Sequence, residues 1–319
     1  MKTSESSINR PYYPISQYYR NLFGQKVYKI TVSVARTCPH RNLRKKGGGC
    51  VFCDEWGSAG HHLKRVGSLN EQIVANREKL RKRYRVNRFL VYFQPYTNTY
   101  TELSVLEANM EMVLGHDQVC GIVLGTRPDC LPEKVFSLFD RFSQKTYVAV
   151  ELGAQSFVDQ RLVFLNRGHT AKQSLEAIER LHRQTNVDIG LHLMFGLPGE
   201  TEREIIETAK RINELPVSNV KLHNLHVLAD TPLECLYRSG AFEPIELEAY
   251  ARRVIIFLTH LSPKIAVQRL AAVAARWDEL IAPRWTKERM RPTQYIIKEM
   301  EKHGLFQGLY CYRNPIGVG

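Results

Sequence analysis

The feature that most constrains the fold is a regular alternation of short apolar segments with longer amphipathic ones. Six segments rich in apolar and β-branched residues are predicted to be strands: 27–34, 89–93, 121–124, 147–152, 187–194 and 220–225. Helices are predicted between them, at 69–84, 101–114, 132–142, 170–184 and from Thr201 onward. Short, nearly continuous apolar strands are typical of a parallel sheet that helices cover. The alternation therefore predicts an α/β fold built from repeated βα units.

The pattern changes at both ends of the chain. Residues 1–25 contain several tyrosines, and we expect them to form an irregular arm. After residue 230 the alternation stops, and long helices are predicted at 245–261 and 290–303. The sequence thus predicts an N-terminal arm (1–25), a barrel domain (26–229) and a mainly helical C-terminal extension (230–319) that closes one side of the barrel.

Three of the seven cysteines lie close together directly after the first predicted strand. Cys50 and Cys53 are separated by two residues, so both thiolates can reach one metal centre, and a basic, glycine-rich loop brings Cys38 back to them. Three thiolates leave one coordination position open. In a zinc site a histidine such as His40 or His61 would fill it. In a [4Fe–4S] cluster, one iron would stay open to an exogenous ligand. Spacing alone does not decide between these two centres.

The other four cysteines are scattered and are expected to act as small apolar side chains: Cys120, Cys130, Cys235 and Cys311. An odd number of cysteines, with three clustered, fits a reducing cytoplasm better than a disulfide framework. No apolar run approaches the ~20 residues that span a bilayer. The first ten residues are polar and lack the apolar core of a signal peptide. We therefore expect a cytoplasmic protein with no membrane partner.

Polar residues collect directly after the predicted strands, which is where α/β barrels hold their functional sites. Residues 94–99 follow the second strand and 126–129 the third; residues 151–156 and 166–169 follow the fourth, and 192–200 the fifth. Any one of these segments is ordinary loop chemistry. Five of them at consecutive strand ends, with the cysteine loop on the first, predict an active site. His223 and His226 lie three apart on the sixth predicted strand, so they are expected to face opposite sides and not to bind one metal.

A formal net charge of +13 favours a polyanionic partner such as nucleic acid. One basic segment lies inside the cysteine loop: Arg41, Arg44, Lys45 and Lys46. Another surrounds the first long helix: Arg77, Lys79, Arg81, Lys82, Arg83, Arg85 and Arg88. For that helix the alternative is a solvated basic face. RNA loops are bound by basic residues together with stacking aromatics, and the candidates are Tyr84, Tyr96, Tyr100, Trp277 and Trp285.

In their order and place, these motifs resemble those of radical S-adenosylmethionine (SAM) enzymes, specifically the group close to the catalytic subunit of Elongator. The resemblance covers about residues 26–270 and rests on six motifs: Cys-Pro-His (38–40), Cys-Val-Phe-Cys (50–53), Thr-Arg-Pro-Asp (126–129), Glu-Leu-Gly-Ala-Gln-Ser (151–156), Asn-Arg-Gly-His-Thr (166–170) and Gly-Leu-Pro-Gly (196–199). Residues 92–99 resemble most a bacterial branch of small stand-alone relatives without the acetyltransferase domain. The resemblance implies a partial (βα)6 TIM-like radical SAM barrel with a helical C-terminal appendage.

The resemblance also implies the cofactors and their ligands. Cys38, Cys50 and Cys53 would hold a [4Fe–4S] cluster whose open iron binds SAM. One electron, from a donor such as a flavodoxin or ferredoxin, would cleave SAM and give a 5′-deoxyadenosyl radical that abstracts a substrate hydrogen. Nine positions are implied in SAM binding: Phe52, Gln94, Thr97, Glu151, Gln155, Arg167, His192, Gly196 and Pro198. Arg167 is expected at the SAM carboxylate and Phe52 beside the adenine. For Glu151 the alternative is a structural carboxylate at a strand end.

Two positions depart from the pattern of the family. Eleven residues separate Cys38 from Cys50, more than the relatives usually have, and they are unusually basic. Where relatives tend to carry a basic residue and a glycine before Thr231, this chain has Ala229 and Asp230.

The leading hypothesis for function is a radical SAM enzyme that modifies tRNA, at carbon 5 of a wobble uridine or on the substituent already there. It rests on the resemblance and on the basic segments. One alternative is a radical SAM enzyme acting on a peptide or a small metabolite. Another is a zinc-dependent RNA-binding protein that uses the three cysteines and a histidine.

Overall fold

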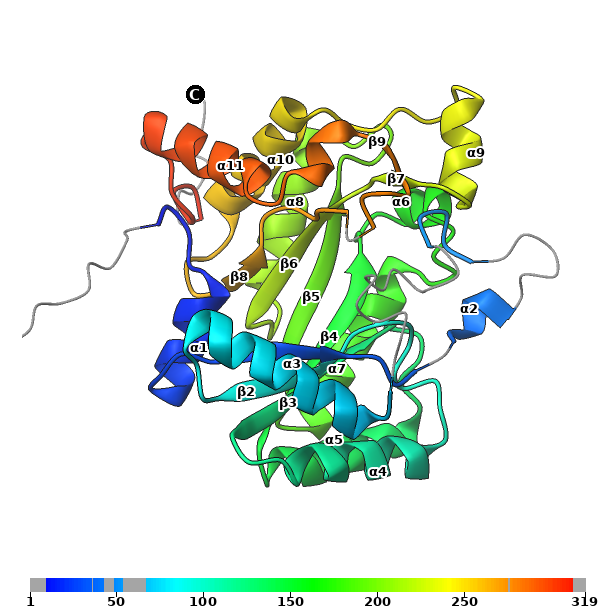
Figure 1. Ribbon diagram of the computed structural model, residues 1–319. Coiled ribbons are helices and arrows are strands. Elements are labelled where there is room, and N and C mark those ends of the chain that lie inside the picture. The colour runs from blue at the N-terminus through cyan, green and yellow to red at the C-terminus, as the bar shows by residue number, and fades with distance from the viewer. Residues whose placement is uncertain (1–9, 36, 43–48, 54–66, 275, 312–319) are drawn as a thin grey trace, which may run out of the picture.

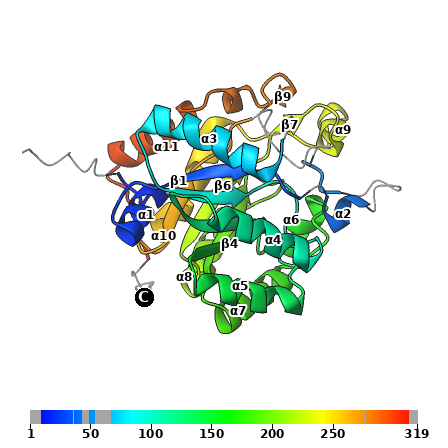
Figure 2. The same ribbon diagram turned by 60° about the horizontal axis from the view of Figure 1, so that its bottom comes forward.

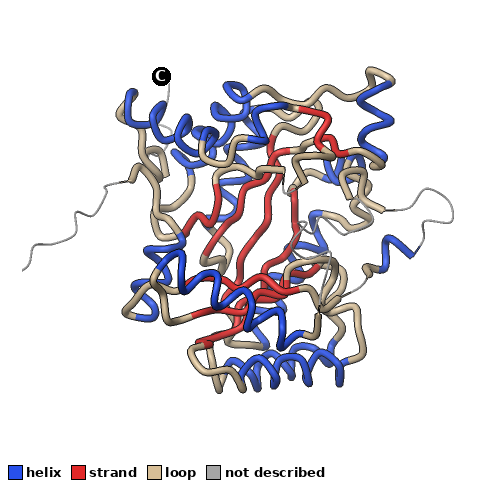
Figure 3. The backbone as a smooth tube through the Cα atoms, viewed as in Figure 1, coloured by secondary structure: helices blue, strands red, loops and turns tan. Residues whose placement is uncertain are grey.

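The computed structural model of the protein describes residues 10–35, 37–42, 49–53, 67–274 and 276–311. At its centre is a parallel sheet of seven strands in the order β1-β2-β3-β4-β5-β6-β8, and the sheet curves strongly (Figure 1, Figure 3). The strands are β1 (Tyr28–Val32), β2 (Phe89–Phe93), β3 (Val119–Thr126), β4 (Tyr147–Gln155), β5 (Asp188–Phe195), β6 (Asn219–Asn224) and β8 (Ala266–Arg269). The predicted α/β fold with a partial, TIM-like barrel is confirmed.

Helices connect most of the strands. Those of the described residues are α1 (Ile15–Phe23), α2 (Pro39–Asn42), α3 (Leu69–Tyr84), α4 (Leu103–Leu114), α5 (Glu133–Ser143), α6 (Asp159–Phe164), α7 (Ala171–Gln184), α8 (Glu202–Asn213), α9 (Pro232–Arg238), α10 (Leu247–His260) and α11 (Arg291–Lys302). Among them, α3, α4, α5 and α7 pack on the outer face of the sheet. Figure 2 shows α4, α5 and α7 grouped on the outer side, where they pack against β3, β4 and β5. The helix predicted from Thr201 onward is α8, and it begins with a capping box of Thr201 and Glu204.

The two faces of the sheet differ in chemistry. Alternate side chains of a strand point to opposite faces. On the outer face these side chains are apolar and fully buried against the helices, as for Ile30 and Val32 of β1 and Val91 and Phe93 of β2. On the inner face the strands carry charged and polar residues from their middle to their carboxyl ends, beginning with Lys29 on β1. This polar inner face positions the site described below.

The floor of the barrel, at the amino ends of the strands, is apolar and is covered by α1. Tyr19 of α1 packs there with Leu90, Val123 and Ala149. The expectation of an irregular arm over residues 1–25 is therefore wrong for residues 15–23, which form a helix. Gly24 ends that helix in the left-handed conformation (φ 70°) typical of a helix C-terminus.

The C-terminal extension contributes a strand to the barrel, which the sequence did not predict. Residues 266–269 form β8, which pairs with β6 and makes the sheet seven-stranded rather than six-stranded. A second, antiparallel pair joins β7 (Val227–Leu228) to β9 (Leu280–Ala282). A 3₁₀ helix (Arg284–Lys287) and α11 follow, as the predicted helical character of this region requires. The proposed domain limits at residues 25 and 229 remain predictions.

His223 and His226 do not lie on one strand, contrary to the prediction. β6 ends at Asn224, so His226 lies beyond the strand and the alternation of strand side chains does not apply to it. Both residues are half-buried. Burial and Arg269 lower the pKa of His223, and His226 adds a smaller contribution. No helix in the described part of the chain is long and apolar enough to cross a membrane.

Candidate functional site

The cysteine turn lies at the carboxyl edge of the sheet and is held by main-chain hydrogen bonds. The Cys53 amide donates to the Cys50 carbonyl (3.0 Å), and the Val51 amide donates to the Leu165 carbonyl after α6 (3.1 Å). The Leu233 amide of α9 donates to the Val51 carbonyl (2.9 Å), and α2 and α9 lie on the same side of the molecule (Figure 1). The side chains of residues 51 and 52 pack in a small apolar cluster with α9. The turn is therefore fixed independently of any metal.

The three cysteines are free thiols in the structure. Cys38 and Cys50 are buried, and Cys53 is half-buried. Among the residues described, no group of three or more cysteine, histidine or acidic side chains is close enough to hold a metal ion. His61, proposed as a zinc ligand, and the loop residues Arg44, Lys45 and Lys46 lie outside the described residues.

Arg167 connects the cysteine turn to strand β4. One of its guanidinium nitrogens, Nη1, donates to the Cys50 sulfur (3.2 Å), and Nη2 donates to the Gly153 carbonyl (2.8 Å). Its third nitrogen, Nε, is buried without a hydrogen-bond partner. Thiolate is the metal-binding form of cysteine, and a guanidinium donor beside the sulfur suits that form. Gly153 leaves room for this contact, because a Cβ at this position would lie 2.9 Å from Arg167 Nη2 and would displace the guanidinium.

A second buried arginine holds the loop that carries Arg167. Arg127 donates through Nε and Nη2 to the two carboxylate oxygens of Asp129 (2.9 and 2.8 Å) and through Nη2 to the Arg167 carbonyl (2.6 Å). Burial opposes ionisation of Asp129, but the hydrogen bonds and charge of Arg127 outweigh it and lower the pKa of that carboxyl. His169 lies beside them, and burial together with both arginines lowers its pKa to about 4. His169 is therefore neutral at pH 7.

Gln155 ends β4 in a conformation that is uncommon for a residue with a side chain. Its φ is 66°, and the pairing of β4 with β5 shifts between Leu152 and Gln155. Its amide oxygen is buried without a hydrogen-bond partner. Bulges next to active sites re-aim side chains, and backbone strain clusters at such sites. Together with Arg167, the unpaired amide oxygen marks this edge as a place where a polar ligand fits.

The loop after β2 is held to the same edge by Asn98. Its amide nitrogen donates to the carbonyls of Phe93 (2.9 Å) and Gly125 (2.8 Å). Thr97 is buried and Gln94 half-buried beside it. The guanidinium of Arg41, from α2, stacks 5.2 Å from the ring centre of Tyr96, which joins this loop to the cysteine segment.

Glu151 and His192 lie deeper in the barrel than the other predicted cofactor residues. His192 Nε2 is 2.7 Å from Glu151 Oε2, and Glu151 also accepts hydrogen bonds from Lys29 and from Gln268 (2.9 Å). Although burial opposes the ionised form, the charges of Lys29 and Lys221 hold the pKa of Glu151 well below its usual range. These contacts favour the alternative given above, a structural carboxylate, while the predicted cofactor contact of Glu151 remains a prediction.

The loop from Gly196 to Gly199 is fixed from two sides. Arg161 donates to the Pro198 carbonyl (2.7 Å) and the Gly199 carbonyl (2.5 Å). On the other side, the Gly196 amide donates to a carboxylate oxygen of Glu200 (2.7 Å). Protein contacts on both sides thus hold this loop in position.

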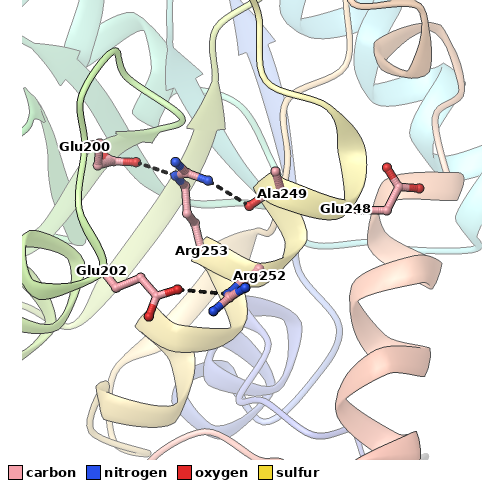
Figure 4. Close-up of a pocket in the computed structure, with 6 residues that line it drawn as sticks. All are labelled: Glu200, Glu202, Glu248, Ala249, Arg252 and Arg253. Atoms are coloured by element: carbon pink, nitrogen blue, oxygen red, sulfur yellow. Dashed lines mark hydrogen bonds and ion pairs between the residues drawn. The ribbon is translucent and has the colours of Figure 1, made fainter.

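Glu200 links that loop to the C-terminal part of the chain. Figure 4 shows Arg253 of α10 reaching Glu200 (3.2 Å), with a second pair between Arg252 and Glu202 (2.8 Å), around a cavity of about 410 Å³. The Glu200 side chain is only 7% exposed. Burial raises its pKa to about 7, although the Gly196 amide and Arg253 oppose the rise.

Glu200 should make stability depend on pH. Because folding raises its pKa from 4.5 to about 7, the folded protein holds this proton more tightly than the unfolded chain does. The stabilisation of the folded state by this proton is therefore complete below pH 4.5 and is lost as pH rises through 7. The loss amounts to about 3 kcal/mol. The free energies of unfolding of wild type and Glu200→Gln are measured with urea from pH 4.5 to 8. Over this range the wild type should lose that amount of stability relative to the variant. Parallel profiles would contradict it.

Several residues of the site were not predicted from sequence. Arg161, Asn98 and Gly153 shape the loops, and Lys29 and Lys221 pair with Glu151 across the barrel. A signal for the last two was present, because each is a charged residue inside a predicted strand with an apolar residue on either side. In a strand with one face buried against helices, such a residue indicates a polar inner face.

The aromatic residues proposed to stack on RNA divide into two groups. Trp277 is 62% exposed, Tyr84 and Tyr100 are also exposed, and Tyr96 is half-buried, so part of each ring is accessible to a partner, although Tyr84 also stacks on Tyr28. Trp285 is buried, and its indole nitrogen donates to the Ile245 carbonyl (3.0 Å). The prediction for Trp285 was therefore wrong, because the sequence does not reveal that it fills a core position.

Comparison with known proteins gives matches over most of the chain. The family described as the radical SAM superfamily matches residues 32–212, and the radical SAM C-terminal domain matches residues 217–302. Uncharacterized protein YtqA of Bacillus subtilis is 31% identical over 308 residues, which are 97% of this chain and 95% of that protein.

Two more distant matches are an enzyme of 26% identity and a solved structure of 17% identity. A tRNA uridine(34) acetyltransferase of Methanocaldococcus jannaschii is 26% identical over 191 residues, covering 58% of this chain and 33% of that protein. The structure of Elp3 from Methanocaldococcus infernus, with residues 1–46 deleted, superposes with a TM-score of 0.67 at 17% identity. The match covers 88% of this chain and 64% of that one, and at this identity it indicates a shared fold.

Proposed function

Since the chain belongs to the radical SAM superfamily, in a group similar to Elp3, we propose that it modifies tRNA at carbon 5 of a wobble uridine or on the substituent already there. The cofactors of the family are a [4Fe–4S] cluster and SAM, which together supply a radical able to remove hydrogen from carbon. An electron donor such as a flavodoxin or ferredoxin would serve it.

The observation that carries the cofactor sites is the unpaired polar edge around Arg167. Its buried Nε has no partner, while its neighbouring nitrogen contacts the Cys50 sulfur. A carboxylate at this point would accept charge-assisted hydrogen bonds from the planar guanidinium, next to a cluster held by Cys50. Gln155 offers an unpaired acceptor to an amino or hydroxyl group in the same region. These residues therefore fit an amino acid moiety bound beside an iron–sulfur centre.

The other proposed roles follow from position. Cys38, Cys50 and Cys53 would hold the cluster. Gln94 and Thr97, on the loop after β2, would lie near the methionine amino group. Phe52 would pack beside the adenine, and the backbone at Gly196 and Pro198 would line it. His192, held by Glu151 at 2.7 Å, would face the ribose. Burial and the charge of Lys221 lower the pKa of His192 to about 4 although Glu151 opposes this, so His192 would act as a neutral group.

For tRNA, the support is the basic surface together with the named relative. α3 runs antiparallel to β1: Gln72 near its start bonds Ser33 at the end of the strand, and Tyr84 at its end stacks on Tyr28. Its exposed basic end therefore lies about 24 Å from the carboxyl edge of the sheet. Contacts at that distance suit phosphates that position an RNA while one base enters the barrel.

The direct test is mass spectrometry of tRNA nucleosides from a strain that lacks this protein. One modified uridine should disappear and its precursor should accumulate. Re-expression of the wild type should restore it, and expression of the Cys50→Ala variant should not. An unchanged nucleoside profile would reject tRNA as the substrate and favour a peptide or small metabolite.

A further inference from the structure

The inner face of the barrel carries more positive than negative charge. Lys29 of β1, Lys221 of β6 and Arg269 of β8 lie there, and the carboxylate that meets them in the described part of the chain is Glu151. The side chain of Lys221 is 13% exposed, so solvent reaches this face. Taking charges out of water without a partner is costly. A surplus of half-buried cations on this face therefore needs an explanation beyond stability.

Glu151 is already neutralised without Lys221 or Arg269. Lys29 forms a direct ion pair with it, and Gln268 and His192 fill its other acceptor positions. Lys221 is farther away, at 3.5 Å, and donates instead to the Tyr92 hydroxyl (3.2 Å).

Arg269 has no acidic partner among the described residues. It donates to the ring of His223 (2.7 Å) and to the Leu222 carbonyl (3.4 Å). Neither an imidazole nor a carbonyl carries a negative charge. Burial and Arg269 itself hold the pKa of His223 well below its usual range, so this ring is neutral. Burial also lowers the pKa of Arg269, and burial with Arg269 and Lys29 lowers that of Lys221 to about 7 despite the opposing effect of Glu151. Without an anion beside them, Lys221 and Arg269 are therefore in surroundings that oppose their charged forms.

The backbone brings these groups together. His192, Lys221 and Arg269 occupy paired positions on the neighbouring strands β5, β6 and β8. The pairing of β6 with β8 shifts beside Lys221, and this irregularity lets both Gln268 and Arg269 contact inner-face groups. The rings of His192 and His223 lie 5.1 Å apart next to them. Such local irregularities are typical of functional sites.

We propose that Lys221, Arg269 and His223 form a binding site for an oxyanion, a carboxylate or phosphate group of the molecule on which the enzyme acts. Arg269 offers a planar fork that matches either group, and Lys221 adds a point charge on the neighbouring strand. The ligand would supply the negative charge that the inner face lacks. The site goes beyond the proposed function, because it would hold an anionic substrate whether or not that substrate is a tRNA.

The proposal predicts opposite effects for the same substitution at two positions of the inner face. Lys221→Met removes a cation that is only the second partner of Glu151, at 3.5 Å, so the urea midpoint of the purified full-length protein should stay or rise. Lys29→Met, the matched control, leaves the buried Glu151 without its main partner, so its midpoint should fall. If Lys221→Met lowers the midpoint as much as Lys29→Met, Lys221 is a structural counter-ion of Glu151 and the proposal is wrong.

Anion binding itself is measured with two probes. Sodium acetate or sodium phosphate at about 10 mM, compared with chloride at equal ionic strength, should raise the midpoint of the wild type. The rise should be lost in both Lys221→Met and Arg269→Met. Stabilisation by acetate alone identifies a carboxylate ligand, and by phosphate alone a phosphate ligand. No rise in the wild type, or an equal rise in the variants, overturns the site.

Discussion

Replacing Cys38, Cys50 or Cys53 by alanine is expected to abolish the iron–sulfur cluster. Anaerobically reconstituted wild-type protein should contain about four irons and four sulfides, and each variant should retain little of either. Two thiolates cannot hold the three irons that the protein must ligate. The loss should be confined to the cluster, because main-chain hydrogen bonds to Leu165 and Leu233 hold the turn from residue 50 to 53 whatever side chains it carries. Cys38 and Cys50 are buried. Iron and sulfide analysis, with the visible absorption spectrum, measures the effect.

Two other cysteines provide the controls for that experiment. Burial raises the pKa of Cys120 to about 11, so its thiol stays protonated and is a poor metal ligand. Cys235 is exposed on α9, apart from the turn. Cys120→Ala and Cys235→Ala should therefore keep the wild-type iron content. Stoichiometric zinc in the wild type, with no uptake of iron, would reject the radical chemistry and support the zinc-dependent RNA-binding alternative.

Elements with strong local signals were predicted closely from sequence. The bounds predicted for β2 and α3 agree with the structure. In β2 five consecutive residues are apolar, and α3 begins with a capping box of Ser68 and Glu71. Both signals depend on near neighbours in the chain, which a single sequence contains.

β8 and α1 were missed because long-range contacts decide them. β8 has only four residues, Ala-Val-Gln-Arg, and its extended form depends on pairing with β6, about 45 positions earlier in the chain. α1 is rich in tyrosines, which favour strands as readily as helices, and its place is set by Tyr19 packing on the barrel floor. Gly24 was a local signal for the helix end that could have been used.

The location of the candidate site was predictable from the sequence, but the contacts between its side chains were not. Motifs at successive strand ends placed Arg167 near the cysteine turn, and the two residues are indeed in contact. Which partner each side chain takes was not accessible, because partners such as Lys29 and Glu151 are separated by 122 positions. Sequence motifs therefore located the site at the carboxyl edge of the sheet, whereas the surplus of positive charge inside the barrel is visible only in the three-dimensional structure.

Arg167→Ala is expected to weaken SAM binding by about 10- to 100-fold while the iron content stays near wild type. Hydrogen bonds to charged groups contribute about 1.5–3 kcal/mol, which corresponds to that range. Alanine removes the fork proposed to pair with the SAM carboxylate. The cysteine turn keeps its main-chain hydrogen bonds to Leu165 and Leu233, so the cluster ligands stay in place. Equilibrium dialysis of labelled SAM against reconstituted, unreduced protein measures the affinity without turnover.

Two further variants test whether the loss of SAM affinity comes from the carboxylate contact. One keeps the positive charge at position 167, and the other removes an arginine elsewhere in the fold. Arg167→Lys keeps the positive charge but lacks the planar fork, so it should recover only part of the lost affinity. Arg180→Ala on α7 removes an arginine paired with Glu133 (2.7 Å), away from the cysteine turn, and should bind SAM as the wild type does. Unchanged SAM affinity in Arg167→Ala would show that the carboxylate is held elsewhere. Loss of iron from that variant would instead assign Arg167 to the support of Cys50, which it contacts at 3.2 Å.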